Sequence, residues 1–542
     1  GVTRIGDSAF FKCHKLEQVV IPKSVRTIER YAFGDCQKLK KALIPEGVKT
    51  IGEGAFGNCY ELSEFSLPKS ATKIEKLAFA NCLKISGKIV LGNVTKIEEA
   101  TFGCCASLTE IVLPSTVTEI GDTAFGGCQS LTQIVIPDSV KVIGDSAFTE
   151  CKNLTKVTLP KKVTSMGRYV FSFCSSLKEV YLPEGVTEIK EDDFYRCFKL
   201  TKLVIPKTVK KMKLNSCGAD TFEVVFVEGT TTIPEKACYE SDITKVVIPS
   251  TVTTIETKAF ADCRQLTEIV IPGNVKTIGK SAFSGCEIMT KVTMKEGVTT
   301  ISDDAFYYCR KLEQVTIPST VKEIGDRAFK YSKIGTLVLS KGIKSIGEEA
   351  FLYTSLTSVT ISGSDCVIGA NAFNGCTGIT KLTLGEGIKE IGTYAFAGCT
   401  GVTELTLPKG VEFMDEYAFY KCTGLKKLVV SENVATIGDG VFMYCDNLAE
   451  VKLSKGINKI GIGAFAYCDS LKIIEVPDGT TTIDIGAFAY CDNLEQVIIP
   501  SSVTNIGDAI IEYSRKATIY GVTGSYAETY ATENNYNFSP IS

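Results

Sequence analysis

Hydrophobic residues recur along this chain with a period of 22 or 23 residues, and each repeat is marked by a phenylalanine that usually follows an alanine. The marker residues are Phe10, Phe33, Phe56, Phe79, Phe102, Phe125, Phe148, Phe171, Phe194, Phe260, Phe283, Phe306, Phe329, Phe351, Phe373, Phe396, Phe419, Phe442, Phe465 and Phe488. Twenty-three units fill the chain if two degenerate units lie between Phe194 and Phe260 and a last unit ends at Ile511.

One regular unit, residues 108–130, reads LTEIVLPSTVTEIGDTAFGGCQS. Alternating hydrophobic positions predict a short strand over 108–113, which Pro114 ends because proline cannot continue a hydrogen-bonded ladder. A second extended piece is expected over 117–120, and Gly121-Asp122 is typical of a turn.

A unit of 23 residues cannot bury its own apolar face, so its hydrophobic residues must stack on the equivalent residues of neighbouring units. The sequence therefore predicts an α/β-type repeat solenoid of mostly short parallel β-strands, wound as a curved right-handed superhelix. With parallel strands about 4.8 Å apart, the array would rise roughly 110 Å.

The repeated pattern L-x-x-I-x-I-P-x-x-V-x-x-I-G-x-x-A-F-x-x-C resembles the BspA-type leucine-rich repeat from residue 2 to about residue 515. This resemblance implies a leucine-rich repeat fold. It also implies a place on a bacterial cell surface, or in some parasitic protists, and a role in adhesion to host or matrix proteins. The segment ATIYGVTGSYAETYATENNYNF, residues 517–538, resembles the segment that closes such arrays.

The repeat divides the chain into four expected regions. They are an N-terminal arc over 1–208, degenerate repeats over 209–251, a C-terminal arc over 252–515 and a cap over 516–542. In the degenerate region neither the Ala-Phe pair nor the Ile-Gly turn is recognisable, which predicts a kink or an extruded loop and separate unfolding of the two arcs. The cap should contain a strand over 517–522, a break at Gly524-Ser525 and a short helix through Ala527 and Tyr530.

Eighteen of the 22 cysteines stand three residues after the marker phenylalanine and so form one column. A column offers neither converging zinc ligands nor disulfide geometry, so we expect buried free thiols and no metal or other cofactor. Ser241, Ser332 and Thr354 take this place in shortened units, where a small side chain with a weak donor is sufficient. Off the column, Cys238 is expected in the core, and Cys366 is expected to be exposed and reactive.

On the first strand, one solvent-facing position alternates between lysine and glutamate, which neighbouring strands would pair. It holds Lys41, Glu64, Lys156, Glu179, Lys202, Lys245, Glu268, Lys291, Lys381, Glu404, Lys427 and Glu450. Two residues on, the same face carries mainly valine and threonine, beginning with Val112, Val135, Thr158 and Tyr181. This stripe fits either plain strand propensity or a flat surface for a protein partner.

Tyrosine precedes the column cysteine mainly in the C-terminal half of the chain. The residues are Tyr308, Tyr331, Tyr353, Tyr444, Tyr467, Tyr490 and Tyr513. The first nine units instead have Lys12, Asp35, Asn58, Asn81, Cys104, Gly127, Glu150, Phe173 and Arg196. Stacked tyrosines can simply pack on one another, or they can form an aromatic recognition strip for a partner.

Charge and chemistry narrow the possible functions. The 59 Lys+Arg and 62 Asp+Glu leave a formal net charge of -3, which gives no reason to expect a nucleic-acid partner, and no segment is apolar enough to span a membrane. Nucleophile, metalloprotease and phosphate-loop motifs are absent, and the single histidine, His14, excludes sites that need two.

The sequence thus predicts a monomeric, non-enzymatic protein outside the cell, on its surface or secreted, that binds a protein or glycoprotein ligand. The alternative is a structural spacer that holds another domain away from the cell envelope.

Overall fold

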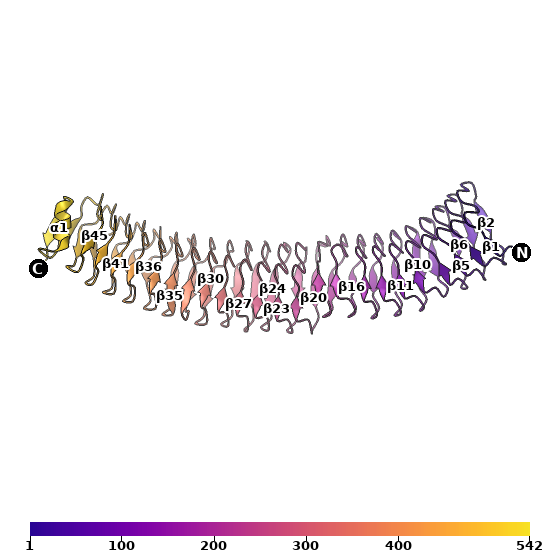
Figure 1. Cartoon of the computed structure of the whole chain (residues 1–542), viewed down its shortest axis with the longest axis horizontal. Coiled ribbons are helices and arrows are strands. Elements are labelled where there is room, and N and C mark those ends of the chain that lie inside the picture. Colours follow the sequence, from indigo (N-terminus) through magenta and orange to yellow (C-terminus); the bar gives the residue numbers. More distant parts are fainter. Residues whose placement is uncertain (542) are drawn as a thin grey trace. The chain divides into compact units, whose positions relative to one another are not determined.

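The computed structural model describes residues 1–541, and the chain divides into two compact units. The N-terminal unit comprises residues 1–252 and 259–266, and the C-terminal unit comprises 253–258 and 267–542. Figure 1 shows each unit as a series of coils that carry short strands. Every strand pair described is parallel and joins neighbouring coils, which confirms the predicted repeat solenoid of about 23 turns.

In the N-terminal unit the even-numbered strands are the first strands. They are β2 (Gln18–Val20), β4 (Lys41–Leu43), β6 (Glu64–Ser66), β8 (Gly87–Val90), β10 (Leu108–Val112), β12 (Gln133–Val135), β14 (Lys156–Thr158), β16 (Glu179–Tyr181), β18 (Lys202–Ile205), β20 (Glu223–Phe226) and β22 (Lys245–Val247). The second strands are β1 (Arg4–Ile5), β3 (Thr27–Ile28), β5 (Thr50–Ile51), β7 (Lys73–Ile74), β9 (Lys96–Ile97), β11 (Glu119–Ile120), β13 (Val142–Ile143), β15 (Ser165–Met166), β17 (Glu188–Ile189), β19 (Lys211–Met212) and β21 (Thr232–Ile233).

The C-terminal unit continues the same alternation. Its first strands are β24 (Glu268–Ile271), β26 (Lys291–Met294), β28 (Gln314–Thr316), β30 (Thr336–Leu339), β32 (Ser358–Ile361), β34 (Lys381–Leu384), β36 (Glu404–Thr406), β38 (Lys427–Val429), β40 (Glu450–Lys452), β42 (Ile473–Glu475), β44 (Gln496–Ile499) and β46 (Thr518–Gly521). Its second strands are β23 (Thr254–Ile255), β25 (Thr277–Ile278), β27 (Thr300–Ile301), β29 (Glu323–Ile324), β31 (Ser345–Ile346), β33 (Cys366–Ile368), β35 (Ile388–Ile391), β37 (Phe413–Met414), β39 (Thr436–Ile437), β41 (Lys459–Ile460), β43 (Thr482–Ile483) and β45 (Asn505–Ile506).

The marker phenylalanines form the centre of the core in both units. Their rings stack face to face, with centroids 5.1–5.9 Å apart from Phe10 to Phe194. From Phe283 to Phe488 the spacing is 5.0–6.0 Å. The Ile-Gly turn lets successive coils approach this closely, since a Cβ on Gly121 would lie 2.9 Å from the backbone nitrogen of Glu99.

The column cysteines are buried free thiols, except the exposed Cys13 in the first coil. Their thiols donate hydrogen bonds to main-chain carbonyls of the preceding coil, as from Cys128 to Phe102 at 3.2 Å. Burial raises the pKa of Cys128 to about 12. Cys238 is buried as expected.

The expectation for Cys366 is wrong, because its side chain is fully buried. The pairing of β33 with β35 shifts register between Cys366 and Val367, and this irregularity turns the cysteine inward. Burial raises the pKa of its thiol to about 12, so Cys366 is not a reactive thiol.

The degenerate region is packed onto the N-terminal unit. Strand β20 pairs with β18 and β22, and Leu214, Cys217 and Phe222 are buried. Residues 213–219 form no helix or strand, and the kink or extruded loop and the separate unfolding of the two arcs stay predictions.

The last coil is covered by a cap. Strand β46 is followed by helix α1 (Tyr526–Glu533), whose Ala527, Tyr530 and Ala531 are buried. The hydroxyl of Tyr530 accepts a hydrogen bond from the main-chain N–H of Ile510 at 3.2 Å. Strand β47 (Asn537–Pro540), which the sequence pattern did not indicate, then pairs with β46 in parallel.

Candidate functional site

The position before the column cysteine has a left-handed backbone wherever its residue is tyrosine. The seven tyrosines expected to form a strip have φ between 55° and 67°. The same position in the N-terminal unit is also left-handed, with φ of 59° at Lys12, 57° at Asp35 and 60° at Asn58. The fold thus sets this backbone conformation in both units, whatever the side chain.

Four of these tyrosines form a continuous stack. Ring centroids are 4.2 Å apart from Tyr444 to Tyr467, 4.5 Å from Tyr467 to Tyr490 and 4.7 Å from Tyr490 to Tyr513, with the rings nearly parallel. Tyr490 and Tyr513 are exposed, and Tyr444 and Tyr467 are half-buried. Because the ring faces lie against each other, the stack presents ring edges and hydroxyl groups to a partner.

Sequence reasoning missed three tyrosines that extend this stack. Tyr394 and Tyr417, two residues before their marker phenylalanines, stack at 4.9 Å, and Tyr420 contacts Tyr417 and Tyr444 edge to face. The spacing of 23 residues between Tyr394 and Tyr417 was the signal that could have found them. We call the seven residues the second tyrosine cluster: Tyr394, Tyr417, Tyr420, Tyr444, Tyr467, Tyr490 and Tyr513.

The other three expected tyrosines form a separate group. Tyr331 stacks on Tyr353 at 5.9 Å and meets Tyr308 edge to face, also at 5.9 Å. Tyr307, which the sequence did not single out, contacts both Tyr308 and Tyr331. These four residues are the first tyrosine cluster. Gly375, Gly398 and Lys421 occupy the column between the two clusters, so the seven expected tyrosines do not form one strip.

The hydroxyl of Tyr444 has a raised pKa, chiefly because of burial and then through its hydrogen bond with Tyr467. Tyr394 also has a raised pKa, again mainly because of burial. These two hydroxyls therefore stay protonated at neutral pH and can both donate and accept hydrogen bonds.

The valine and threonine stripe of the N-terminal unit lies along one line of the first strands. Val112, Val135, Thr158 and Tyr181 are register partners on successive strands. All four side chains are exposed, and Val135 has 79% of its surface accessible. The structure thus brings these four predicted residues together, and whether they bind a partner stays a prediction.

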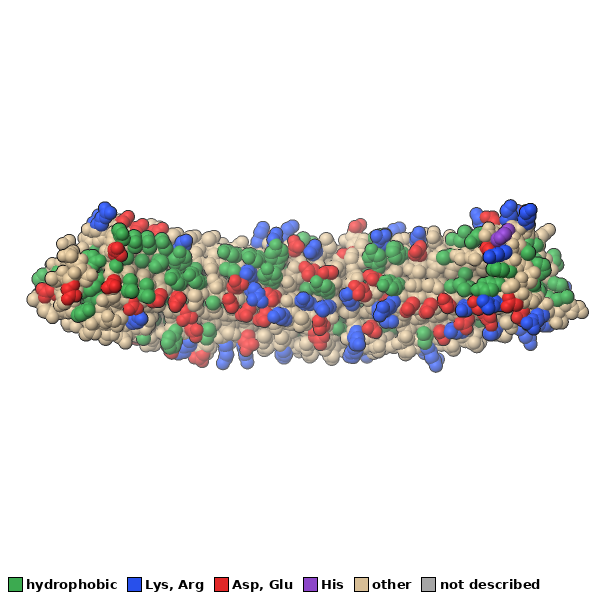
Figure 2. All heavy atoms as spheres, turned by 45° about the horizontal axis from the view of Figure 1, so that its top comes forward, with side chains coloured by type: hydrophobic (Ala, Val, Ile, Leu, Met, Phe, Trp, Pro, Cys, Tyr) green, Lys and Arg blue, Asp and Glu red, His purple; other side chains and the backbone are tan. Residues whose placement is uncertain are grey.

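Two neighbouring pairs of the alternating charges form ion pairs between strands. Lys41 lies 2.6 Å from Glu64, and Lys427 lies 3.2 Å from Glu450. Figure 2 shows the result on one face, where basic and acidic side chains are interspersed and hydrophobic side chains form separate patches. Exposed pairs of this kind contribute up to about 1 kcal/mol each to stability, so the ladder is explained by the sheet itself.

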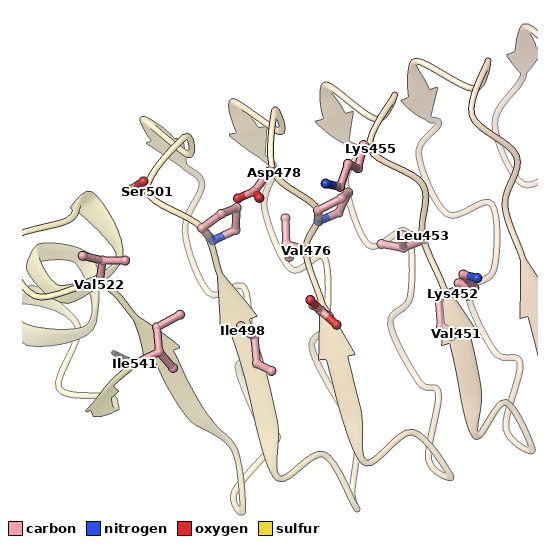
Figure 3. Close-up of a pocket in the computed structure, with 13 residues that line it drawn as sticks. Val451, Lys452, Leu453, Lys455, Val476, Asp478, Ile498, Ser501, Val522 and Ile541 are labelled. Atoms are coloured by element: carbon pink, nitrogen blue, oxygen red, sulfur yellow. The ribbon is translucent and has the colours of Figure 1, made fainter.

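A further groove lies near the C-terminal cap and contains no tyrosine. Its apolar lining includes Leu453, Val476 and Ile541, and Lys455 and Asp478 bring charges to it. Figure 3 shows these residues coming from successive coils and from the end of the chain. The groove thus combines apolar and charged side chains.

Within residues 1–541, no three or more His, Cys, Asp or Glu side chains lie close enough together to hold a metal ion. Across the same residues, no helix has the length and apolar character needed to cross a membrane.

The sequence of the chain matches a protein-family model, and this match agrees with the repeat geometry. The family model described as "BspA type Leucine rich repeat region (6 copies)" matches residues 1–105, 95–218, 231–356, 344–472 and 414–535. The chain belongs to this family. The coil, its phenylalanine core and its cysteine column all repeat along the chain, whereas the tyrosine clusters are confined to the C-terminal unit.

Solved structures with similar coils come from several bacteria. A leucine-rich repeat protein from Bacteroides ovatus is 21% identical over 76% of this chain and 92% of its own, with a TM-score of 0.43. A leucine rich cell surface protein from Faecalibacterium prausnitzii is 22% identical over 77% and 85%, with a TM-score of 0.28. The pneumococcal vaccine antigen PcpA is 17% identical over 71% and 88%, with a TM-score of 0.32. No curated protein matches the chain.

Proposed function

We propose that this BspA-type repeat protein is a non-catalytic interaction protein outside the cell, on its surface or secreted. It binds a host or matrix protein or glycoprotein through the tyrosines of its C-terminal unit. The observation that carries the proposal is the continuous stack of Tyr444, Tyr467, Tyr490 and Tyr513, of which Tyr490 and Tyr513 are exposed.

The left-handed backbone before the column cysteine disfavours a bulky side chain by roughly 1–2 kcal/mol, whereas glycine and asparagine adopt it readily. At this position the N-terminal unit has asparagine or glycine in three coils, at Asn58, Asn81 and Gly127, and mostly charged or bulky residues in the other coils. Tyrosine is therefore not what the coil requires at this position. Tyrosine supplies contact area and a hydroxyl at modest entropic cost.

The stripe Val112, Val135, Thr158 and Tyr181 offers a second, weaker contact surface. Its side chains are exposed, but strands favour β-branched residues in any case. We therefore expect the stripe to add contact area to an interface and not to supply its anchoring residues. A structural spacer that presents another domain would use neither surface. The charge ladder fits both roles, because its ion pairs stabilise the sheet in either case.

The test is binding of the full chain to an array of purified matrix proteins and mucin-type glycoproteins, measured by surface plasmon resonance. Changing Tyr444, Tyr467 and Tyr490 together to asparagine should weaken binding more than tenfold, because truncating one anchoring tyrosine commonly costs about 2 kcal/mol. The matched control changes Lys12, Asp35 and Glu150 to asparagine at the same position of the N-terminal unit. Equal loss in both triple variants, or loss in neither, would contradict the proposal.

A further inference from the structure

The first tyrosine cluster carries two basic groups without acidic partners. The Arg310 guanidinium lies over the ring of Tyr308, with Cζ 4.0 Å from the centroid. Lys333, on the next coil, is exposed. Throughout the described residues 1–541, neither side chain makes an ion pair. Both charges are therefore available to a ligand.

Two other basic groups of the same loops are already neutralised. Arg327 makes a bidentate pair with Asp304, at 2.8 and 3.1 Å, and Lys330 lies 2.7 Å from Glu349. Because Asp304 and Glu349 are held in these pairs, they do not compete with a ligand for Arg310 and Lys333. Of the remaining basic groups of these loops, Arg310 and Lys333 line the hollow described next, whereas the exposed Lys311 does not.

The two unpaired cations face an open hollow. It is lined by Tyr307, Tyr308, Tyr331 and Tyr353 together with Arg310 and Lys333, and two serines complete the wall. Tyr353 is 57% exposed. A carboxylate in this hollow can pair with the guanidinium in a bidentate way, while its aliphatic stem packs on the rings. The tyrosine hydroxyls offer further donors.

The second tyrosine cluster has more acidic than basic residues around it. Its loops over 392–401, 415–424, 438–447, 461–470, 484–493 and 507–516 contain nine acidic residues and three basic ones, Lys421, Arg515 and Lys516. The pKa of Asp469 is raised by burial and then by the charges of Asp492 and Asp446. The corresponding loops of the first tyrosine cluster, over 302–311, 325–334 and 347–356, contain five acidic and five basic residues, so the second cluster has the more acidic surroundings.

We propose that the hollow of the first tyrosine cluster binds an acidic, carboxylate-rich peptide segment of the protein partner. This inference rests on the proposed function and deepens it by giving one cluster its ligand chemistry. The formal net charge of -3 disfavours non-specific binding of acidic peptides, so binding here is a property of the hollow.

The probe is a fluorescein-labelled decaglutamate peptide, and its binding to the full chain is followed by fluorescence anisotropy. We expect saturable binding that weakens as salt rises. Changing both Arg310 and Lys333 to glutamine should weaken it at least tenfold, and Tyr353→Asn should weaken it about threefold to tenfold. The control changes Lys421 and Lys516 to glutamine, which removes the same charge beside the second tyrosine cluster and should leave the affinity unchanged. Thermal melting of each variant checks its fold.

Several outcomes would overturn the inference. They are absence of decaglutamate binding, equal affinity of the Arg310/Lys333 variant, equal binding of labelled decalysine, and binding only of a glucuronate-containing hexasaccharide, which would assign the hollow to a glycan. The Tyr444/Tyr467/Tyr490 triple variant should bind decaglutamate normally. Failure of this inference therefore leaves the test of the proposed function, which uses that triple variant, unaffected.

Discussion

The same position of the coil is filled differently in the two units of this protein. Before the column cysteine, the N-terminal unit has a mixture of charged, small and polar residues, including Lys12, Asp35 and Asn58. The C-terminal unit has tyrosine in seven coils. The backbone is left-handed in both units, and the phenylalanine columns behind it have similar ring spacings.

This difference distinguishes positions at which the fold requires one type of residue from a position at which it accepts many. The phenylalanine and cysteine columns are alike in both units because every coil must bury the same faces. The residue before the cysteine points away from that core, and asparagine, glycine or lysine completes the coil equally well. Tyrosine there is explained by stacking on its neighbours and, in our proposal, by contact with a partner.

Thiol reactivity should show the largest contrast between the units. Only Cys13 and Cys104 are exposed among the cysteines, and both belong to the N-terminal unit. Burial raises the pKa of column thiols such as Cys128 to about 12, so they should not react as thiolates at neutral pH. Maleimide labelling followed by peptide mass mapping should modify these two thiols in the native protein and all 22 after denaturation. Fast labelling of Cys366 or of any column thiol beyond Cys13 would contradict the buried ladder.

Truncating a marker phenylalanine should cost the same in either unit. Phe125 lies between rings at 5.9 and 5.5 Å, and Phe396 lies between rings at 5.0 and 5.3 Å. We expect Phe125→Ala and Phe396→Ala each to lower the free energy of unfolding by about 3–5 kcal/mol. Hydrogen exchange under native conditions measures the loss coil by coil. A cost in one unit only would show that the two cores are not equivalent.

Asp193 should make the N-terminal unit sensitive to pH. It replaces the alanine before Phe194, is buried, and accepts one hydrogen bond from the main-chain N–H of Lys190, while its Oδ1 has no partner. Burial raises its pKa from 3.8 to about 7. The native state therefore holds a proton that the unfolded chain releases near pH 4. The stabilising contribution is complete below about pH 4 and is lost as the pH rises through about 7.

Asp193→Ala should remove this dependence. At pH 8 the variant should be more stable than the parent by a few kcal/mol, since each pKa unit corresponds to about 1.4 kcal/mol. The advantage should shrink as the pH falls toward 4. Denaturant unfolding at several pH values measures it, with the exposed Asp138→Asn as the control. A stability difference that stays constant from pH 4 to 8 would show that Asp193 does not titrate in this range.

The smallest effect is expected from adding tyrosines to the N-terminal unit. Asn58 and Asn81 share the left-handed conformation, and their side chains are hydrogen-bonded to each other at 2.8 Å. Replacing both by tyrosine removes this hydrogen bond and the residue type that adopts a left-handed backbone readily. In return it adds a pair of stacked rings, which stabilises by about 0.5–1.5 kcal/mol. The melting temperature should therefore change by only a few degrees. Loss of the cooperative transition would mean that the N-terminal coil cannot accept the tyrosine column.

Much of this structure follows from the repeat. The period, the strand ended by Pro114, the buried cysteine column and the capping helix through Tyr530 were predicted, because each depends on local pattern or on stacking of identical units. Strand β47 was missed because its sequence, Asn-Phe-Ser-Pro, has no strand pattern and forms only against β46. Cys366 was placed wrongly because one shifted residue in β33 turns a side chain from outside to inside.

The candidate site was predicted only in part. The tyrosine column is visible in the sequence, but its division into two clusters depends on Gly375, Gly398 and Lys421 between them. The left-handed backbone could have been inferred from Asn58, Asn81 and Gly127 in the same column. The sequence could not have predicted that Arg310 and Lys333 are unpaired. Their state depends on the ion pairs that Asp304 and Glu349 make with other basic residues.

The central claim is that the tyrosines of the C-terminal unit are not needed by its fold. Hydrogen exchange of the full chain carrying Tyr444→Asn, Tyr467→Asn and Tyr490→Asn tests it most directly, because asparagine already occupies this position at Asn58 and Asn81. The account predicts that protection of the coils around Phe442, Phe465 and Phe488 falls by no more than about 1–2 kcal/mol, the order of one stacked aromatic pair. A loss approaching that of Phe396→Ala would contradict it and assign the tyrosine column to the core of the fold.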